Sequence, residues 1–102
     1  MPKVYIAGKI TGDANYKRKY ARVKGILQKL GFTVLSPASL PEGMTAADYM
    51  RICFAMIDTA DTVVFLPDYT QSPSALLEHQ YCVYIGKPML LYHSIVKEEG
   101  QC

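Results

Sequence analysis

The sequence lacks the marks of several large protein classes. Its 102 residues contain no tryptophan, two histidines and three cysteines with no C-x-x-C pair, so neither a disulfide framework nor a structural zinc site is indicated. No apolar run approaches the roughly 18–20 residues of a membrane span. The 11 Lys and Arg against 9 Asp and Glu do not give the concentrated basic charge of a duplex-binding domain. We therefore expect no metal, no cofactor, no membrane and no duplex nucleic acid as a partner.

The cysteines and the first residues bear on the cellular compartment. Cys53, Cys82 and Cys102 are odd in number and far apart in the sequence, which is typical of a reduced cytosolic protein. Met1 to Lys3 lead directly into a short apolar run, too short and too early for a signal peptide. A cytoplasmic location is the expectation.

The composition is that of one folded domain. Half of the residues are hydrophobic and 20% are charged, which excludes a disordered chain or a highly charged tail. A chain of this length can form one hydrophobic core but not two. We expect a domain over residues 1–93 and a polar C-terminal tail over residues 94–102.

Short strand-like runs alternate with helical patterns along the chain. Runs rich in β-branched, aromatic and other apolar residues predict four strands, at residues 3–8, 32–35, 61–66 and 89–92. Between them, apolar residues at helical spacing predict three helices. The order is therefore strand-helix repeated three times and closed by a fourth strand.

Local signals predict where the helices begin and end. Asp13 or Asn15 can cap the first helix, in which Tyr16, Tyr20, Val23, Leu27 and Leu30 form an apolar face that Gly31 ends. Thr45 and Asp48 have the spacing of a capping box before the second helix. Ser72 is placed to cap the third helix, with Pro73 at its first position and Gly86 at its end.

Helical crossovers between buried strands predict a parallel sheet with helices on both faces. Right-handed crossovers then favour the strand order 2-1-3-4. The fold class expected is α/β, a single flavodoxin-like or Rossmann-like doubly wound sheet of about four strands. The open edge at the fourth strand and the eight tyrosines predict a homo-oligomer.

Ligands of such sheets bind beyond the carboxyl ends of the strands, where the strand order reverses. The loop after the first strand contains Gly8 and Gly12, with Lys9 and Thr11 between them. Exposed amides, a hydroxyl and a cation near a helix start suit a phosphate or a carboxylate. A glycine turn with a structural role only is equally compatible, because the spacing matches neither the Walker A motif nor the dinucleotide-binding motif.

Glu78 is the acidic residue best placed for chemistry. It lies in the second turn of a helix that begins at the ligand edge of the sheet, where a carboxylate is electrostatically favoured. The alternative is an ordinary glutamate that is solvated or only stabilises the helix. His79 is expected at the surface, and the cations of the first helix are expected to form its solvated side.

Four motifs, taken together, resemble the nucleoside 2-deoxyribosyltransferase superfamily. They are residues 4–12, 60–64, 72–78 and 86–88, and the resemblance covers residues 3–92. It is closest to a branch common in phages and bacteria, and the chain is also similar to the nucleoside-monophosphate N-glycoside hydrolases.

The resemblance implies a role for each matched residue. Glu78 matches the glutamate that attacks the anomeric carbon of a ribosyl or deoxyribosyl group and displaces the base, in the manner of a retaining glycosidase. Tyr5 matches a tyrosine that places this carboxylate. The segments that hold a 5′-phosphate in the hydrolases correspond to Gly8, Lys9, Ile10, Thr11, Gly12 and Ser72. Asp68 and Ser74, in the loop after the third strand, are candidate binding residues because that loop lies at the ligand edge of the sheet.

Three positions depart from the family pattern. Cys53 stands where the catalytic enzymes carry an aspartate, Ser72 where transferases carry an acid, and Ser74 where many relatives carry glycine. A thiol cannot replace a carboxylate that hydrogen-bonds the departing base. Asp58 or Asp68 could take that part.

Two functions stay open from the sequence. The first is an N-glycosidase or deoxyribosyltransferase acting on a nucleoside or its 5′-monophosphate, with Glu78 as the nucleophile. The second is a protein that binds a nucleotide, to sense or sequester it, with little or no turnover. Glu78 and Tyr5 favour the first function, and Cys53 and Ser72 favour the second. In both, the partner is a small nucleoside or nucleotide.

Overall fold

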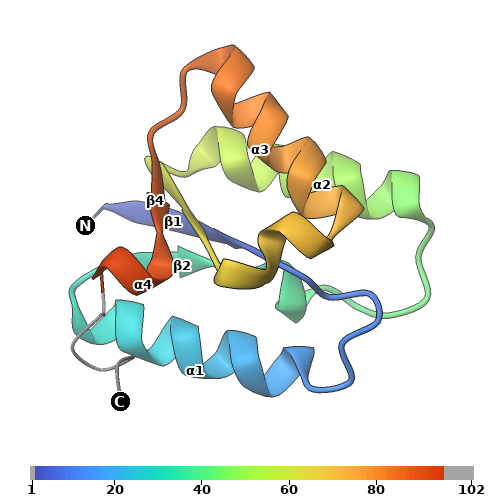
Figure 1. Ribbon diagram of the computed structural model, residues 1–102, viewed down its shortest axis with the longest axis horizontal. Helices are drawn as coiled ribbons and strands as arrows, with labels where there is room; N and C mark the ends of the chain where they lie inside the picture. The colour runs from blue at the N-terminus through green and yellow to red at the C-terminus, as the bar shows by residue number, and fades with distance from the viewer. Residues whose placement is uncertain (1, 96–102) are drawn as a thin grey trace.

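The computed structural model describes residues 2–95, which are built around a four-stranded parallel sheet (Figure 1). The strands are β1 (Lys3–Ala7), β2 (Thr33–Leu35), β3 (Thr62–Phe65) and β4 (Met89–Leu91). Their order in the sheet is β2-β1-β3-β4. The α/β class and the strand order predicted from the sequence are both confirmed.

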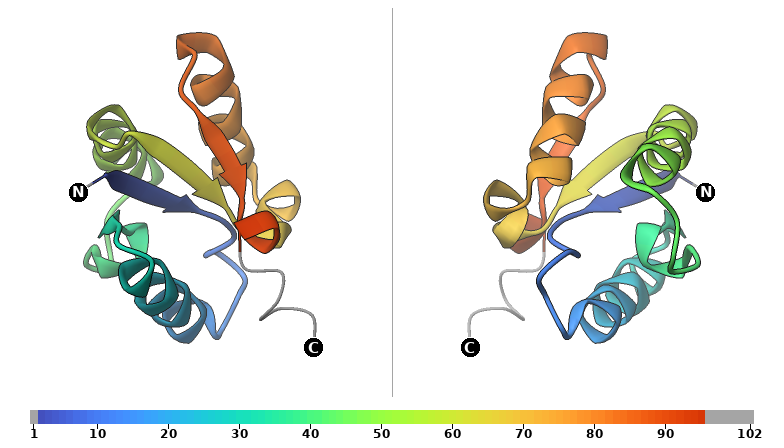
Figure 2. Two further views of the ribbon diagram at one scale, coloured as in Figure 1. Left: turned by 90° about the vertical axis from the view of Figure 1, so that its left-hand side faces the viewer. Right: turned by 90° about the vertical axis from the view of Figure 1, so that its right-hand side faces the viewer.

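Helices cover both faces of this sheet (Figure 2). On one face lies α1 (Tyr16–Lys29), and on the other lie α2 (Ala46–Thr59) and α3 (Pro73–Ile85). Two 3₁₀ turns, η1 (Pro37–Ser39) and η2 (Pro67–Gln71), follow β2 and β3, and a short α4 (Tyr92–Ile95) follows β4. Within the described part of the chain, no helix has the length and apolar character needed to cross a membrane.

The two central strands are buried because helices pack on both of their faces. On the α1 side, Val4, Ile6 and Val64 pack with Tyr20, Val23, Leu27 and Leu66. On the side of α2 and α3, Tyr5, Ala7, Val63 and Phe65 pack with Cys53, Ile57, Ala60 and Cys82. Tyr5 therefore projects from the centre of the sheet toward the helix that carries Glu78.

The N-terminal caps predicted from the sequence are confirmed for α2 and α3 but not for α1. Thr45 and Asp48 form the predicted capping box of α2. The Ser72 hydroxyl accepts a hydrogen bond from the backbone N–H of Ala75 at the start of α3, which ends at Gly86 with φ of 74°. A positive φ strains residues with a side chain, so glycine suits this position.

Four expectations need correction. Neither Asp13 nor Asn15 caps α1 through its side chain. Instead, the Asp13 carboxylate accepts a hydrogen bond from the backbone N–H of Asn15 and forms a salt bridge with Lys19. Leu30 is 54% exposed, because α1 ends at Lys29 and Leu30 lies beyond the packed face. β4 ends at Leu91, and Tyr92 begins α4. Of the predicted tail, Ser94 lies in α4, and the part from residue 96, Cys102 included, lies outside the described residues.

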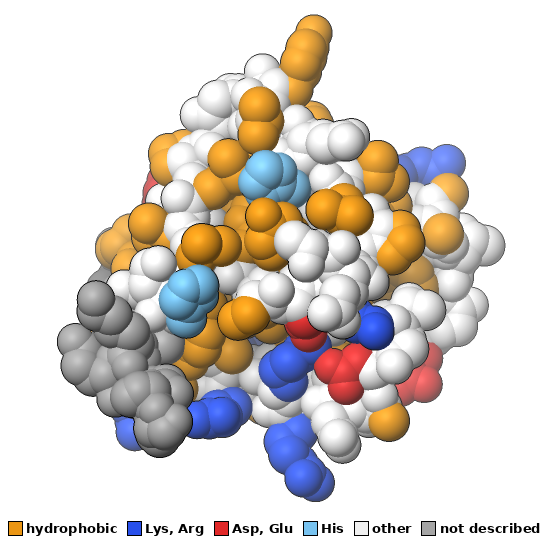
Figure 3. All heavy atoms as spheres, viewed as in Figure 1, with side chains coloured by type: hydrophobic (Ala, Val, Ile, Leu, Met, Phe, Trp, Pro, Cys, Tyr) orange, Lys and Arg blue, Asp and Glu red, His pale blue; other side chains and the backbone are white. Residues whose placement is uncertain are grey.

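The surface differs in charge from one helix to another. Figure 3 shows Lys and Arg gathered along the side where α1 lies, and hydrophobic side chains spread over the region of α3. The predicted solvated cationic side of α1 is therefore visible, whereas the outer side of α3 lacks such a coat.

Candidate active site

Glu78 is a buried carboxylate at the carboxyl end of the sheet. The cap at Ser72 and the turn at Pro73 start α3 beside the end of β3, so Glu78 lies two turns into the helix on its inner side. Only 5% of the residue is exposed. The Tyr5 hydroxyl, projecting from β1, donates a hydrogen bond of 2.9 Å to Glu78 Oε2. The structure thus brings together the two residues for which catalytic roles were predicted, 73 positions apart in sequence.

Burial controls the protonation of this group. Because a charge in a low-dielectric site is disfavoured, burial raises the pKa of the Glu78 carboxyl to about 7, and hydrogen bonds from Tyr5 and Cys53 oppose part of that rise. Burial, and then the charge of Glu78, raise the pKa of the Tyr5 hydroxyl well above its ordinary value. Burial also raises the pKa of the Cys53 thiol to about 11. Near neutral pH, Tyr5 and Cys53 are neutral donors around a carboxyl that is half ionised.

A cavity of about 150 Å³ opens beside this carboxyl. Cavities of that volume accommodate about one six-membered ring. Its lining consists of Tyr5, Gly8, Ile10, Thr11, Tyr16, Pro37, Leu40, Tyr49, Met50, Cys53, Ser74 and Glu78. Glu78 is the only acid in this lining, so a ring bound here meets one carboxylate, several hydroxyls and apolar walls.

The loop after β1 forms one wall of the cavity and is held in place by ion pairs. Lys19 Nζ lies 2.6 Å from carboxylate oxygens of both Asp13 and Asp68 and donates to the carbonyl oxygen of Lys9. Asp68 also accepts from the backbone N–H of Lys9 at 3.0 Å. A charged network with few exposed atoms therefore ties the loop to α1 and to η2.

Gly8 is required where this loop passes β3. A Cβ at this position would lie 2.9 Å from Leu66 Cδ1 and 3.0 Å from Asp68 Oδ1. The close approach of the two segments leaves no room for a side chain. The glycine thus has a structural role in addition to its place in the cavity wall.

The predicted site residues fall into two groups. Six of them line the cavity: Tyr5, Gly8, Ile10, Thr11, Ser74 and Glu78. Four are outside the lining: Lys9, Gly12, Asp68 and Ser72. Ser72 caps α3, and its hydroxyl lies 3.2 Å from that of Ser74. Asp68 is occupied by the loop network described above, on the α1 side.

Neither aspartate considered as a replacement for the missing acid reaches the cavity. Asp58 accepts a hydrogen bond of 2.6 Å from the Tyr81 hydroxyl at the surface, and Asp68 is paired with Lys19. Among residues 2–95, no group of three or more His, Cys, Asp and Glu side chains is arranged to hold a metal ion.

Sequence reasoning missed five residues of the lining. Tyr16 was placed in the apolar face of α1, and Tyr49 and Met50 lie on α2, whereas Pro37 and Leu40 follow β2. The end of β2 lies at the same sheet edge as the end of β1. Ser36 and Pro37 follow β2 directly, and a proline after a strand is the signal that could have located Pro37.

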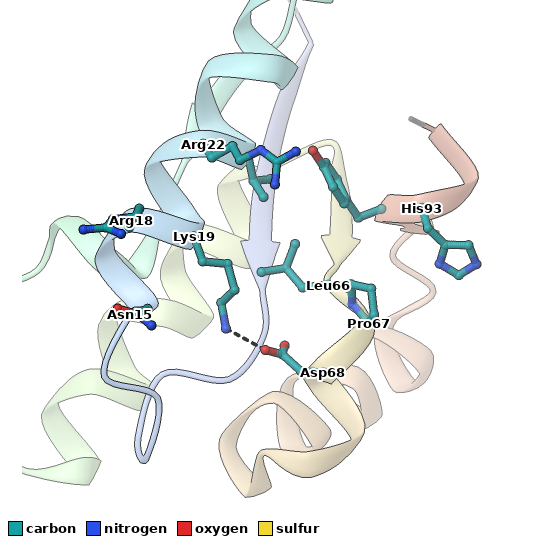
Figure 4. Close-up of a pocket in the computed structure, with 10 residues that line it drawn as sticks. Asn15, Arg18, Lys19, Arg22, Leu66, Pro67, Asp68 and His93 are labelled. Atoms are coloured by element: carbon teal, nitrogen blue, oxygen red, sulfur yellow. Dashed lines mark hydrogen bonds and ion pairs between the residues drawn. The ribbon is translucent and has the colours of Figure 1, made fainter. Parts of the chain in front are cut away.

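A larger cavity of about 600 Å³ lies on the α1 side of the sheet, between α1, the end of β3 and α4 (Figure 4). Lys19 reaches from α1 to Asp68 across this cavity, and Arg18, Arg22 and His93 also line it. The acid in this lining, Asp68, is already paired with Lys19. This cavity contains no unpaired carboxylate and is separate from Glu78.

Comparisons with known proteins agree on the fold. The model of a family described as a domain of unknown function (DUF4406) matches residues 2–91. No curated protein matches the sequence. Among solved structures, a 2-desoxiribosyltransferase from Leishmania mexicana is 19% identical with a TM-score of 0.70, covering 89% of this chain and 63% of that one.

Two further structures share the architecture. The 2-deoxyribosyltransferase from Bacillus psychrosaccharolyticus is 24% identical with a TM-score of 0.64, covering 87% of this chain and 70% of that one. A conserved protein from Enterococcus faecalis V583 is 18% identical with a TM-score of 0.70, covering 89% and 62%. At the level of the fold, these likenesses confirm the resemblance inferred from the motifs. The chain spans less than two thirds of the Leishmania and Enterococcus proteins.

Proposed function

The chain belongs to the DUF4406 family, and from that premise we propose that it cleaves or transfers the N-glycosidic bond of a nucleoside or nucleoside 5′-monophosphate. The observation that carries this proposal is the buried Glu78 carboxylate, oriented by Tyr5 and facing a ring-sized cavity. A buried, perturbed carboxylate in a cleft is typical of catalytic sites. The proposal is also supported by two 2-deoxyribosyltransferases that share the fold of this chain.

The reaction follows from the position of the carboxylate. An ionised oxygen of Glu78 attacks the anomeric carbon of the bound sugar and forms a glycosyl ester. The bond from that carbon to the base nitrogen breaks, and its electron pair leaves with the base. Water, or the nitrogen of a second base, then attacks the same carbon and releases the carboxylate. A proton from the attacking water or base is lost to solvent.

The neighbours of Glu78 have supporting roles. Tyr5 fixes one carboxylate oxygen by its 2.9 Å hydrogen bond and so limits the rotation of the side chain. The hydroxyls of Thr11 and Ser74 line the cavity and can bind the hydroxyls of a sugar, whereas the Tyr49 hydroxyl already donates to the carbonyl oxygen of Pro41. The cavity volume suits the sugar ring, so the base lies toward the opening.

The phosphate preference rests on the loop after β1. Gly8, Ile10 and Thr11 of this loop line the cavity, and Lys9, between Gly8 and Ile10, adds a cation to the loop. We propose that a 5′-phosphate binds at this loop. Calorimetry should then show tighter binding of 5′-monophosphates than of the matching nucleosides, and equal affinities would remove the phosphate from the proposal.

One observation favours a second function, binding without efficient turnover. Cys53 hydrogen-bonds to Glu78 and stands where the resemblance implies an aspartate that assists the departing base; burial raises the pKa of its thiol to about 11, so the thiol is neutral near pH 7. No other acid lines the cavity. A nucleotide sensor or sequestering protein would need the cavity but not the proton donor.

A base-release assay separates the two functions. The wild-type chain is incubated with deoxynucleosides, ribonucleosides and their 5′-monophosphates, and free base is followed by chromatography. The enzyme proposal expects release by the wild type and a fall of at least about 100-fold in Glu78→Gln, with ligand binding retained. Tight binding with no release from any substrate supports the sequestering protein instead.

A further inference from the structure

The cavity of about 150 Å³ beside Glu78 (the Glu78 cavity) has one carboxylate in its lining among the described residues. Every other Asp and Glu of residues 2–95 has a partner elsewhere: Asp13 and Asp68 with Lys19, Glu42 with Lys17, Asp48 with Thr45, Asp58 with Tyr81, and Asp61 with Lys3. The histidines also lie outside this lining, His79 stacked on Tyr69 and His93 at the larger cavity. Within the described part of the chain, a base that leaves the Glu78 cavity therefore meets no acidic side chain except the nucleophile itself.

The other protons at the Glu78 cavity are poorly suited to assist a departing base. The Tyr5 hydroxyl donates to Glu78 Oε2, and the Tyr49 hydroxyl donates to the carbonyl oxygen of Pro41. Burial raises the pKa of the Cys53 thiol to about 11. A general acid works best when its pKa lies near the pH of the reaction. A base that needs a proton in order to leave therefore receives little assistance here.

The lining of the Glu78 cavity favours positive charge. Among the described residues that form it, none is Lys, Arg or His. Tyr5, Tyr16 and Tyr49 belong to the lining, and the faces of aromatic rings attract cations. A carboxylate in a site of low dielectric also attracts a cation more strongly than it would in water. A ligand with a cationic ring is therefore better matched to this cavity than a ligand with a neutral ring.

The need for a proton donor depends on the base that leaves. When the bond from the anomeric carbon to the nitrogen of a neutral base breaks, the electron pair makes the base an anion unless an acid protonates it. A base that is already cationic, such as a pyridinium ring or a purine alkylated at N7, departs as a neutral molecule. For such a base, the absence of a general acid removes no assistance.

We propose that the substrates of the Glu78 cavity are N-glycosides with a cationic base, and that Cys53 sets this preference by standing where an acid would assist a neutral base. The preference rests on the proposed function. An oxygen of Glu78 forms a bond to the anomeric carbon while the bond to the ring nitrogen breaks, and the electron pair of that bond cancels the positive charge of the ring. Water then attacks the same carbon, loses a proton to solvent and restores the carboxylate.

The first test compares pairs of substrates that differ in charge and little in shape. One pair is 7-methylguanosine 5′-monophosphate and guanosine 5′-monophosphate, and the other is nicotinamide mononucleotide and its reduced form, in which the ring is neutral. Cationic N-glycosides also break down faster without an enzyme, so the ratio of kcat/KM within each pair is compared with the ratio of the uncatalysed rates. The pair that is cleaved shows whether the base is a purine or a pyridinium ring.

A general acid assists the neutral base alone, by about 100-fold or more, and so makes the enzymatic ratio smaller than the uncatalysed one. Because no such acid is present, we expect the wild type to keep the uncatalysed ratio in full or to exceed it. An enzymatic ratio that is smaller by about 10-fold or more would overturn the preference while leaving the proposed function intact. Release from no substrate of either pair, and from no ordinary nucleoside, would contradict the proposed function itself.

The second test adds the missing acid. Cys53→Asp should lower the ratio of kcat/KM for the cationic over the neutral substrate by about 10-fold or more, because the neutral base gains a proton donor. Cys53→Asn is the matched control, since it has the shape of aspartate without the acid, and its ratio should stay within about threefold of the wild type. Circular dichroism checks that both variants are folded, and the comparison of substrates on the wild type does not depend on them. A ratio that is equal in folded Cys53→Asp and Cys53→Asn would overturn the role of Cys53.

Discussion

Removing the charge of Glu78 should stabilise the fold while it removes the activity. The substitution Glu78→Gln keeps the shape of the side chain and an acceptor for the Tyr5 hydroxyl, but it eliminates a carboxyl that ionises in a buried site. Near neutral pH the wild type loses stability through this ionisation. The variant has no such loss.

The size of the effect follows from the pKa. Burial raises the pKa of Glu78 from 4.5 to about 7, and at about 1.36 kcal/mol for each tenfold change in acidity this corresponds to about 3 kcal/mol. Between these two pH values the Glu78 carboxyl is still protonated in the folded state but is already ionised in the unfolded state. The stability of the wild type therefore falls as pH rises from about 4.5 to 7 and is level above that range.

Urea denaturation of both chains at pH 5 and pH 8 measures this difference. Glu78→Gln should match the wild type within about 1 kcal/mol at pH 5 and exceed it by up to about 3 kcal/mol at pH 8. In a domain of this length the corresponding rise in Tm is about 10 °C or more.

Glu42→Gln is the matched control for this experiment. Glu42 is exposed and ion-paired with Lys17, which holds its pKa below the usual value. That substitution should therefore give no stabilisation at pH 8. A Glu78→Gln chain that is less stable than the wild type at pH 8, or equal to it at both pH values, would show that ionisation of the buried carboxyl does not destabilise the fold.

Three further predictions concern the neighbours of Glu78 and its loop. Base release should rise with pH through a midpoint of about 7, as Glu78 ionises. Tyr5→Phe should move that midpoint upward, because it removes a hydrogen bond that lowers the pKa of Glu78. A pH–rate profile with an unmoved midpoint would contradict this. Cys53→Asp should raise base release by about 10-fold or more if a proton donor is missing, whereas unchanged turnover in the same assay would show that it is not. Lys19→Met should cost about 1–3 kcal/mol in urea denaturation, because it leaves two facing carboxylates unpaired; the control Lys17→Met, at an exposed pair, should stay within about 0.5 kcal/mol.

The parts of the fold that could be predicted are encoded by neighbouring residues. The capping box of Thr45 and Asp48, the Ser72 cap and the Gly86 stop each depend on residues within a few positions of one another, and all are present in the structure. The strand order follows from the handedness of the crossovers, which also needs no knowledge of side-chain contacts.

The contacts that could not be predicted join residues that no local motif connects. Asp13 was one of two possible caps of the first helix, but its carboxylate pairs with the amine of Lys19 and accepts a hydrogen bond from the backbone N–H of Asn15. Asp68, a candidate substrate-binding residue, pairs with the same lysine, 49 positions away. No spacing in the sequence indicates such a pair.

The candidate site was predictable only in part for the same reason. Glu78 and the glycine loop could be found because the fold places helix starts and strand ends at one edge. The wall formed by Leu40, Tyr49 and Met50 comes from a link and a helix whose packing over the cavity depends on the tertiary structure. Because β1 and β2 end at the same edge of the sheet, the sequence indicated where this wall lies but not which side chains form it.

The central claim is that Glu78 forms a covalent bond to the sugar, and mass spectrometry tests it most directly. Wild-type chain mixed with a substrate that releases base is quenched in acid within seconds and digested. We expect a peptide containing Glu78 that is heavier by one glycosyl group, and we expect it to be absent from Glu78→Gln treated in the same way. Base release by the wild type with no adduct, together with release that survives in Glu78→Gln, would contradict it.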